Sequence, residues 1–144
     1  MIVPRFADTN ILLYAISSAP DESEKAKIAA ALLKAPDLAL SVQVFQEFYV
    51  QATRPSARDP LAPEEALNFL ATLRRFPVLD LSLELFVAAA ATSRRWRISY
   101  WDAAVVEAAR VLGCPEVLSE DLQDGMDFGG VKVTNPFRRP EQVL

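Results

Sequence analysis

Short runs of hydrophobic residues alternate along this chain with longer segments in which polar residues are interspersed among apolar or alanine-rich ones. We expect the short runs to be strands and the longer segments to be helices. The predicted strands span 2–7, 38–40, 77–81, 116–119 and 131–134, and the predicted helices span 11–16, 22–33, 42–53, 63–75, 83–96 and 101–112. Strands that alternate with helices predict an α/β fold: a central, mostly parallel five-stranded sheet flanked by helices on both faces.

Single residues refine two of these boundaries. Pro4 lacks a backbone N–H, so it is expected at the start of the first strand or on a sheet edge. Ser41 directly precedes the third predicted helix and is expected to cap its N-terminus.

Acidic residues stand at the ends of two predicted strands. Asp8 follows the first strand, and Asp121 follows the fourth. Ligands of parallel α/β sheets bind beyond the carboxyl ends of the strands, so both carboxylates are expected at one rim of the sheet. Asp102 opens a helix with an apolar stripe, and Glu47 lies mid-helix among large apolar residues. Each acid alone has a simpler explanation as a helix-end charge, a turn residue or a solvated residue. Their joint order favours one site.

The composition narrows the chemistry of such a site. The chain has no His and a single Cys, Cys114, which excludes imidazole-based catalysis, zinc sites built on His, and a disulfide within the chain. We expect Cys114 to be a small apolar filler. Two carboxylates about 4 Å apart repel by roughly 4 kcal/mol at an effective dielectric of 20, so a cluster of them needs a cation. Oxygen ligands select Mg²⁺ or Mn²⁺ over zinc.

Length and charge set the broad class. The 144 residues fit one domain, 1–144, and the net charge is −4, which is unlike a basic nucleic-acid coat protein. No apolar run reaches the roughly 18 residues of a membrane span, and the N-terminus meets Asp8 too early for a secretory signal. We therefore expect a cytoplasmic protein that does not bind a membrane.

Five ordered motifs carry a resemblance to a known family. They are Phe6-Ala7-Asp8-Thr9-Asn10, Ser41 followed by Glu47, Ser99-Tyr100-Trp101-Asp102-Ala103-Ala104, Ser119-Glu120-Asp121-Leu122-Gln123-Asp124-Gly125, and Val133-Thr134-Asn135-Pro136-Phe137. In this order and spacing the chain resembles the PIN-domain family, and within it the VapC-type ribonuclease toxins of toxin–antitoxin pairs.

The resemblance implies a site and an activity. The metal-binding acids would be Asp8, Glu47, Asp102 and Asp121, and the side chains that orient them or a bound water would be Thr9, Asn10 and Ser119. The implied activity is Mg²⁺- or Mn²⁺-dependent cleavage of RNA by a homodimer that a cognate antitoxin inhibits.

Two alternatives stay open. One is a PIN-like module that binds RNA or a partner without cleaving. The other is a receiver or phosphoryl-transfer domain with an acidic Mg²⁺ pocket, in which Lys132 would imitate the late-strand Lys, although no strand-terminal Asp partners it well.

The segment 119–125 holds three carboxylates that cannot be equivalent. Strand geometry predicts that Asp121 shares the pocket face with Ser119, and that Glu120 points the other way, into solvent. If the chain then turns helically, Asp124 returns to the pocket side and acts on the ion through a water or another residue. The alternative for Asp124 is a turn residue before Gly125.

Overall fold

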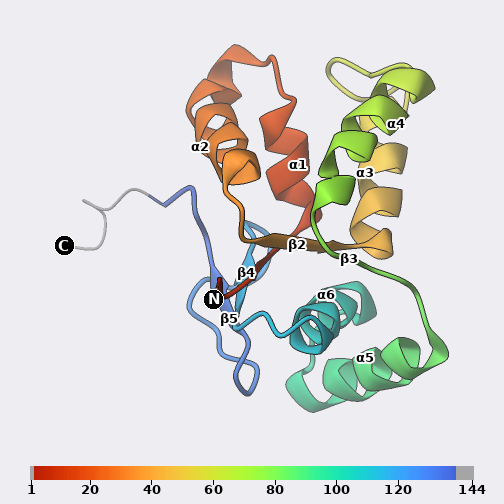
Figure 1. The fold of residues 1–144 in the computed structure, drawn as a ribbon, viewed down its shortest axis with the longest axis vertical. Helices are drawn as coiled ribbons and strands as arrows, with labels where there is room; N and C mark the ends of the chain where they lie inside the picture. Colours follow the sequence, from red (N-terminus) through yellow and green to blue (C-terminus); the bar gives the residue numbers. More distant parts are fainter. Residues whose placement is uncertain (1, 139–144) are drawn as a thin grey trace.

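The computed structural model describes residues 2–138 and shows strands alternating with helices (Figure 1). The strands are β1 (Arg5–Ala7), β2 (Leu38–Ser41), β3 (Val78–Leu79), β4 (Glu116–Leu118) and β5 (Lys132–Thr134). The α-helices are α1 (Thr9–Ala15), α2 (Ser23–Lys34), α3 (Val42–Thr53), α4 (Pro63–Thr72), α5 (Leu83–Trp96) and α6 (Tyr100–Val111). Two short 3₁₀ turns, η1 (Pro20–Glu22) and η2 (Leu73–Arg75), complete the described elements.

The five strands form one parallel sheet in the order β3-β2-β1-β4-β5. Phe6 of β1 lies opposite Ala39 of β2 and Val117 of β4. The central strand is therefore β1, and its C-terminal end opens onto the middle of the sheet rim. The predicted α/β fold with a parallel five-stranded sheet is confirmed.

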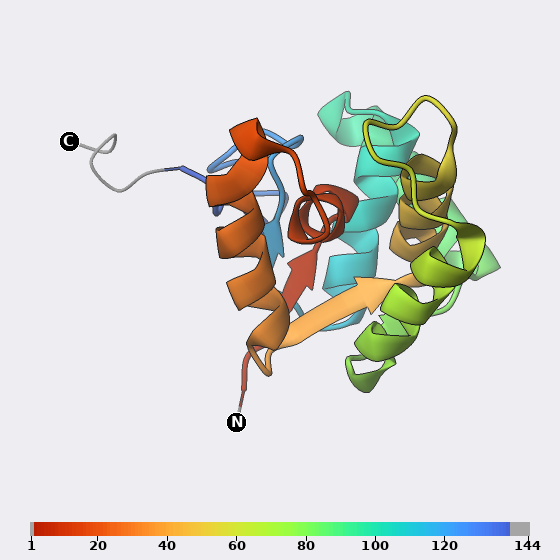
Figure 2. The same ribbon diagram turned by 90° about the horizontal axis from the view of Figure 1, so that it is seen from above.

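The helices cover both faces of the sheet. Helices α1 to α4 lie on one side, and the hairpin of α5 and α6 lies on the other (Figures 1 and 2). The hydroxyls of Ser41, Ser82 and Ser99 each accept the backbone N–H three residues on and so cap α3, α5 and α6. The cap predicted at Ser41 is confirmed. The cap at Ser99 fixes the start of α6, and hence the position of Asp102.

Two predicted strands are shorter than expected by more than one residue. The first begins at Arg5, because Pro4 has no N–H with which to extend the ladder. The third is reduced to Val78–Leu79 on the sheet edge, where a single neighbour pairs with it. The predicted helix over 63–75 ends as the 3₁₀ turn η2.

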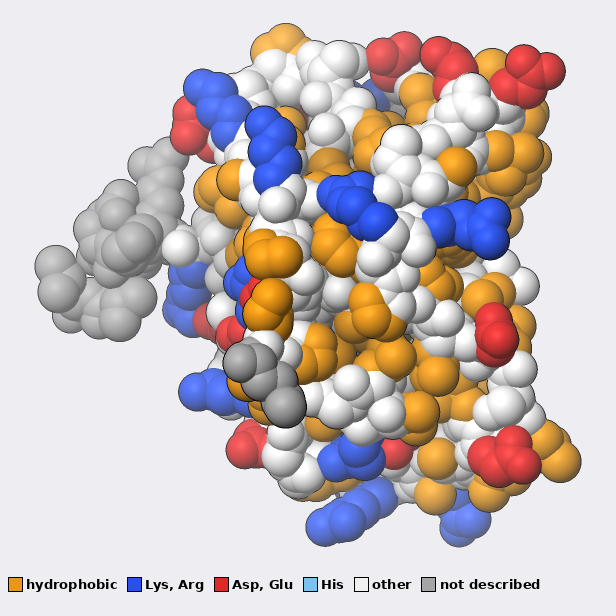
Figure 3. All heavy atoms as spheres, in the orientation of Figure 1, with side chains coloured by type: hydrophobic (Ala, Val, Ile, Leu, Met, Phe, Trp, Pro, Cys, Tyr) orange, Lys and Arg blue, Asp and Glu red, His pale blue; other side chains and the backbone are white. Residues whose placement is uncertain are grey.

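Charge is spread over the surface. On the face seen in Figure 3, Lys and Arg side chains lie apart from one another and do not form a single basic patch. In the span 2–138, no helix has the length and apolar character needed to cross a membrane.

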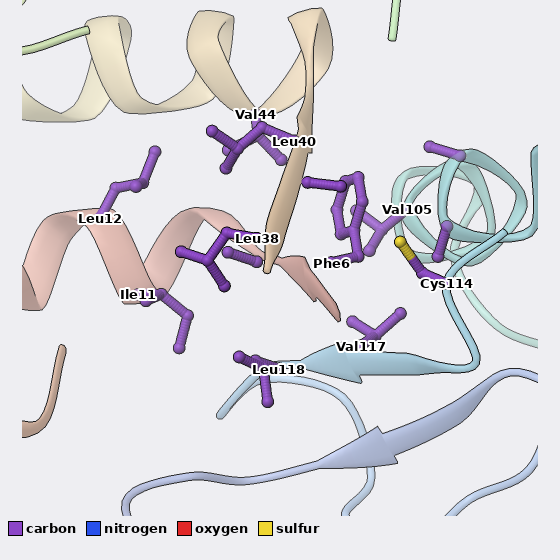
Figure 4. Packing of buried hydrophobic residues seen from close by; sticks show 14 of the residues in the cluster. Phe6, Ile11, Leu12, Leu38, Leu40, Val44, Val105, Cys114, Val117 and Leu118 are labelled. Atoms are coloured by element: carbon purple, nitrogen blue, oxygen red, sulfur yellow. The ribbon is translucent and has the colours of Figure 1, made fainter. Parts of the chain in front are cut away.

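The core fills both sides of the sheet. Phe6 lies in the group that includes Val105 of α6 and Cys114, whereas Leu38 and Leu118 lie nearer α1 (Figure 4). Burial raises the pKa of the Cys114 thiol to about 11, so the thiol stays protonated and packs as an apolar group. The prediction for Cys114 is confirmed.

Candidate acidic site at the rim of the sheet

Asp8 lies where the central strand β1 passes into α1. It is the N-cap of α1, and only 7% of the residue is exposed. Its Oδ1 accepts the N–H of Thr9 at 2.8 Å, and its Oδ2 accepts the hydroxyl of Ser119 at 2.7 Å. Both carboxylate oxygens therefore have fixed partners, which hold the group in one orientation.

Asn10 and Ser119 join Asp8 to Asp121. The Asn10 amide nitrogen lies 3.2 Å from Ser119 Oγ, 3.3 Å from Asp121 Oδ2 and 3.4 Å from Asp8 Oδ2, so its two protons are shared among three acceptors. The amide oxygen accepts the N–H of Glu120 at 3.1 Å. The hydroxyl of Ser119, which is fully buried, also accepts the N–H of Asp121 at 3.1 Å. These bonds bring the two strand-end acids together, as the parallel sheet predicted.

The other two acids come from helices. Glu47 on α3 accepts the hydroxyl of Thr9 at 2.7 Å. Asp102 lies in the first turn of α6, where its N–H donates to the Ser99 hydroxyl at 3.0 Å. Partial burial raises the pKa of Asp102, and the nearby charge of Asp121 raises it further. The hydrogen bond with Ser99 acts in the opposite direction and lowers this pKa. Asp102 therefore lies within electrostatic reach of the strand-end pair.

The Asp8 carboxylate is buried and lies near other negative charges. Burial raises the pKa of Asp8 to about 6, although the bonds from Ser119 and Thr9 lower it, and the charges of Glu47 and Asp121 add to the rise. A cation at this place would relieve both the repulsion and the cost of the buried charge.

The donor set fits a hydrated hard cation. Among residues 2–138, no three Asp, Glu or Cys side chains are placed to hold an ion by direct contact alone. Mg²⁺ characteristically takes one or two carboxylates and keeps several waters, so a full protein cage is not required. Asp8 and Asp121, which share the Asn10 amide, are the pair best placed to bind such an ion. Glu47 and Asp102 would then act through water.

The prediction that Glu120 points into solvent is wrong. Its carboxylate accepts bonds from the Tyr14 hydroxyl and from Lys25 Nζ at 2.5 Å. Partial burial raises the pKa of Glu120, but Lys25 and Tyr14 together hold it below its ordinary value. Glu120 and Asp121 do have different partners, but α1 and α2 occupy the side to which Glu120 turns. No local pattern marked Lys25, because it lies 95 residues away in the sequence.

Asp124 is not brought into the network. The helical turn on which that prediction depended does not form, since 119–125 contains only bends and a hydrogen-bonded turn. Asp124 instead accepts the N–H of Asn135 at 2.8 Å and a bond from Arg138 at 2.5 Å. The N–H of Asn135 has the larger effect in lowering the pKa of Asp124, and the bond from Arg138 lowers it further. Asp124 therefore anchors the segment that follows β5.

The receiver alternative fails on the direction of the strands. Lys132 begins β5 and lies opposite Glu116 at the start of β4, whereas Asp8 and Asp121 follow the ends of their strands. Because all five strands are parallel, Lys132 lies at the opposite rim from the acids.

Comparison with known proteins agrees with this fold. A family model described as the PIN domain matches residues 5–123. No curated protein sequence matches the chain. A toxin–antitoxin complex from Klebsiella pneumoniae contains a similar chain at 20% identity, with a TM-score of 0.66 and coverage of 92% of this chain and 97% of that one. The VapBC complex of Rickettsia felis bound to a promoter DNA fragment has 18% identity, a TM-score of 0.64 and coverage of 94% and 98%.

A third solved structure is the sarcin-ricin loop cleaving toxin of Mycobacterium tuberculosis, with 18% identity, a TM-score of 0.62 and coverage of 81% and 91%. At these identities the likeness concerns the fold. The family model, by contrast, spans most of the sequence, from the start of β1 to just beyond Asp121. The chain belongs to the PIN-domain family.

Proposed function

We propose that this protein is a divalent-metal-dependent endoribonuclease, the toxin of a toxin–antitoxin pair. The observation that carries the proposal is the pair of strand-end acids, Asp8 and Asp121, held together by Asn10 and Ser119 at the rim of the sheet. A carboxylate as buried as that of Asp8, with the charge of Asp121 nearby, costs stability unless it is paired or binds a cation. Mg²⁺ or Mn²⁺ is the ion that an oxygen-only donor set selects.

Each residue of the acidic site would have a separate role. Asp8 and Asp121 would hold the ion, which when bound supplies an activated water and stabilises the charge of the leaving oxygen. Ser119 and Asn10 keep the two carboxylates in register. Thr9 orients Glu47 from the neighbouring helix. With water as the nucleophile and the 3′-oxygen as the leaving group, the expected products carry a 5′-phosphate and a 3′-hydroxyl.

RNA is the substrate that we infer from the similar structures. The Mycobacterium tuberculosis chain is a toxin that cleaves the sarcin-ricin loop, and its fold matches this one. The absence of His removes the usual side-chain base of metal-independent ribonucleases. The one-domain chain, 1–144, would work in the cytoplasm as a homodimer.

The proposed regulator is a cognate antitoxin. Two of the similar structures are toxin–antitoxin assemblies, and one of them is bound to promoter DNA. An antitoxin Arg placed at the rim would pair bidentately with the exposed Asp121 and compete with the ion. Co-expression with the adjacent small open reading frame should give a stable complex and suppress toxicity. If the neighbouring product neither binds nor protects, the toxin–antitoxin assignment is wrong.

Cleavage of single-stranded RNA in Mg²⁺, in Mn²⁺ and in excess EDTA tests the activity. We expect cleavage with either ion and none in EDTA. Asp8→Asn should abolish it, and Asp127→Asn is the matched control. Asp127 is exposed and lies opposite Lys132, at the far rim, where its side-chain oxygen accepts the N–H of Gly130. Full activity in EDTA would overturn the metal mechanism, and RNA binding without cleavage would favour the non-catalytic alternative.

A further inference from the structure

A groove runs between α3 and the start of α6, directly beside the acidic site. Its volume is about 320 Å³, at the lower end of the range for small-ligand pockets. It is lined by Gln43, Gln46, Glu47, Val50, Gln51 and Trp101. Glu47 belongs to both the groove and the acidic site, so a ligand in the groove would lie next to the scissile bond.

Trp101 is held as a fixed but open aromatic surface. The residue is 62% exposed, although large aromatic side chains are usually buried. The Tyr100 ring meets its indole edge-to-face at a centroid distance of 5.0 Å, and Phe86 lies 5.7 Å from Tyr100. The Trp101 carbonyl accepts a bond from Gln43 Nε2 at 3.2 Å. The backbone of Trp101 and its contact with Tyr100 are therefore fixed while much of the residue stays exposed.

The lining describes the kind of ligand that fits. Among the described residues that form the groove there is no Lys or Arg, so the groove does not suit a phosphate. Gln46 and Gln51 each offer an amide with donors and an acceptor, and Val50 adds an exposed apolar surface. A flat, uncharged ring with donors and acceptors along its edge matches this combination.

We propose that the groove binds one unpaired nucleobase of the RNA, stacked on Trp101, beside the phosphate that is cleaved. This inference rests on the proposed ribonuclease activity. Sequence-tolerant stacking on an aromatic side chain, with amides at the base edge, is how single-stranded RNA is recognised. A paired base has both faces covered and its edge engaged, so the groove selects single-stranded or looped RNA.

A base fits the groove better than a second protein chain does. The centres of protein interfaces are depleted of charge, whereas Glu47 lines this groove. The exposed apolar side chains Leu83, Phe86 and Val87 lie on α5, outside the residues that line the groove.

The test combines Trp101→Ala with an abasic substitution in a short single-stranded RNA. Trp101→Ala should raise KM by about 5- to 150-fold, the range that corresponds to losing one stacked base, and leave kcat within a few-fold. Trp101→Phe should keep most of the affinity. An abasic residue at the contacted position should raise the KM of the wild type by the same factor. It should not raise the KM of Trp101→Ala any further. Val111→Ala, an equally exposed change at the other end of α6, is the matched control.

Binding of the same oligonucleotides to the Asp8→Asn variant, measured by fluorescence anisotropy, repeats the comparison without cleavage. Independent, additive losses from Trp101→Ala and the abasic residue would overturn the stacking proposal, as would an unchanged KM. A loss that follows a change of oligomeric state in light scattering would show an interface between copies instead. If the wild type cleaves RNA and Trp101→Ala loses no affinity, base binding in the groove is refuted and the proposed ribonuclease function stands. Wild-type protein that neither cleaves nor binds RNA refutes the proposed function as well.

Discussion

The two walls of the acidic site are held in different ways. We call Asp8, Asn10, Ser119 and Asp121 the strand wall, and Glu47 and Asp102 the helix wall. In the strand wall three of the four residues are buried, and the hydrogen bonds among them form a closed network. In the helix wall, Glu47 has one bond from Thr9, and Asp102 relies on the cap at Ser99.

The difference follows from what each wall is built on. Strands β1 and β4 are neighbours with Ala7 opposite Leu118, so the residues that follow them are forced together by the sheet. The helix wall joins α3 and α6, which lie on opposite faces of the sheet (Figure 1). We therefore expect the strand wall to be preorganised for the proposed cation and the helix wall to adjust to substrate.

Loss of charge in the strand wall should have the largest effect on cleavage. We expect Asp8→Asn and Asp121→Asn to lower kcat/KM by about 10³-fold or more, equivalent to roughly 4 kcal/mol. Glu47→Gln and Asp102→Asn should lower it by about 10- to 100-fold, because these residues act through water or another side chain. Single-turnover RNA cleavage at saturating Mn²⁺ measures all four, with circular dichroism as the folding control. Equal losses in both walls would refute the contrast.

The buried charge of Asp8 should lower the stability of the metal-free protein as the pH rises. Its pKa is raised from 3.8 to about 6 in the folded state, so the folded protein binds this proton more tightly than the unfolded chain does. The free energy of unfolding should therefore fall between those two values, by at most about 3 kcal/mol, and stay low above them.

Thermal unfolding in EDTA of the wild type and of Asp8→Asn between pH 4 and 8 isolates this contribution. The variant should become more stable relative to the wild type as the pH rises. Added Mg²⁺ should raise the Tm of the wild type but not that of the variant. A constant difference in Tm across this range would show that the carboxylate is not strained by burial.

Ser119→Ala should damage both stability and metal binding. It removes the hydroxyl that donates to Asp8 and accepts from Asp121, which leaves the buried Asp8 Oδ2 with only the 3.4 Å contact from Asn10, at a cost of about 1–3 kcal/mol. We expect a lower Tm and an apparent Mn²⁺ affinity weakened by about 10- to 100-fold. In the same assay, Thr9→Val should weaken the apparent Mn²⁺ affinity less, because only the side-chain bond to Glu47 is lost. A Ser119→Ala protein that needs no additional Mn²⁺ would contradict the preorganised strand wall.

Changes behind the strand wall should have the smallest effects. Glu120→Gln removes the charge that pairs with Lys25, and we expect a loss of about 1 kcal/mol of stability or less with a several-fold fall in cleavage. Asp124→Asn should cleave like the wild type and lose a little stability, since Asp124 contacts Asn135 and Arg138. If Asp124→Asn is the more damaging of the two in RNA cleavage, the segment 119–125 reaches the substrate differently from this structure.

The sequence alone determined the elements and the meeting of the two strand-end acids. The spacing of apolar runs placed all five strands and six helices, because burying one face of each element demands that pattern. The Ser41 cap and the position of Asp8 after β1 are local features that short-range chemistry fixes. Because the sheet is parallel, residues that follow neighbouring strands must meet at one rim, so the approach of Asp8 and Asp121 needed no further information.

What surrounds that rim depends on packing between segments that are distant in the sequence. Whether Glu120 meets solvent or Lys25 depends on how α2 packs beside the turn after β4, and no pattern within 119–125 records it. The same holds for the groove at Trp101, which exists because the start of α6 lies against α3. Hydrophobic periodicity specifies which face of a helix is buried, but the neighbour that covers it is chosen by side-chain packing between segments far apart in the chain.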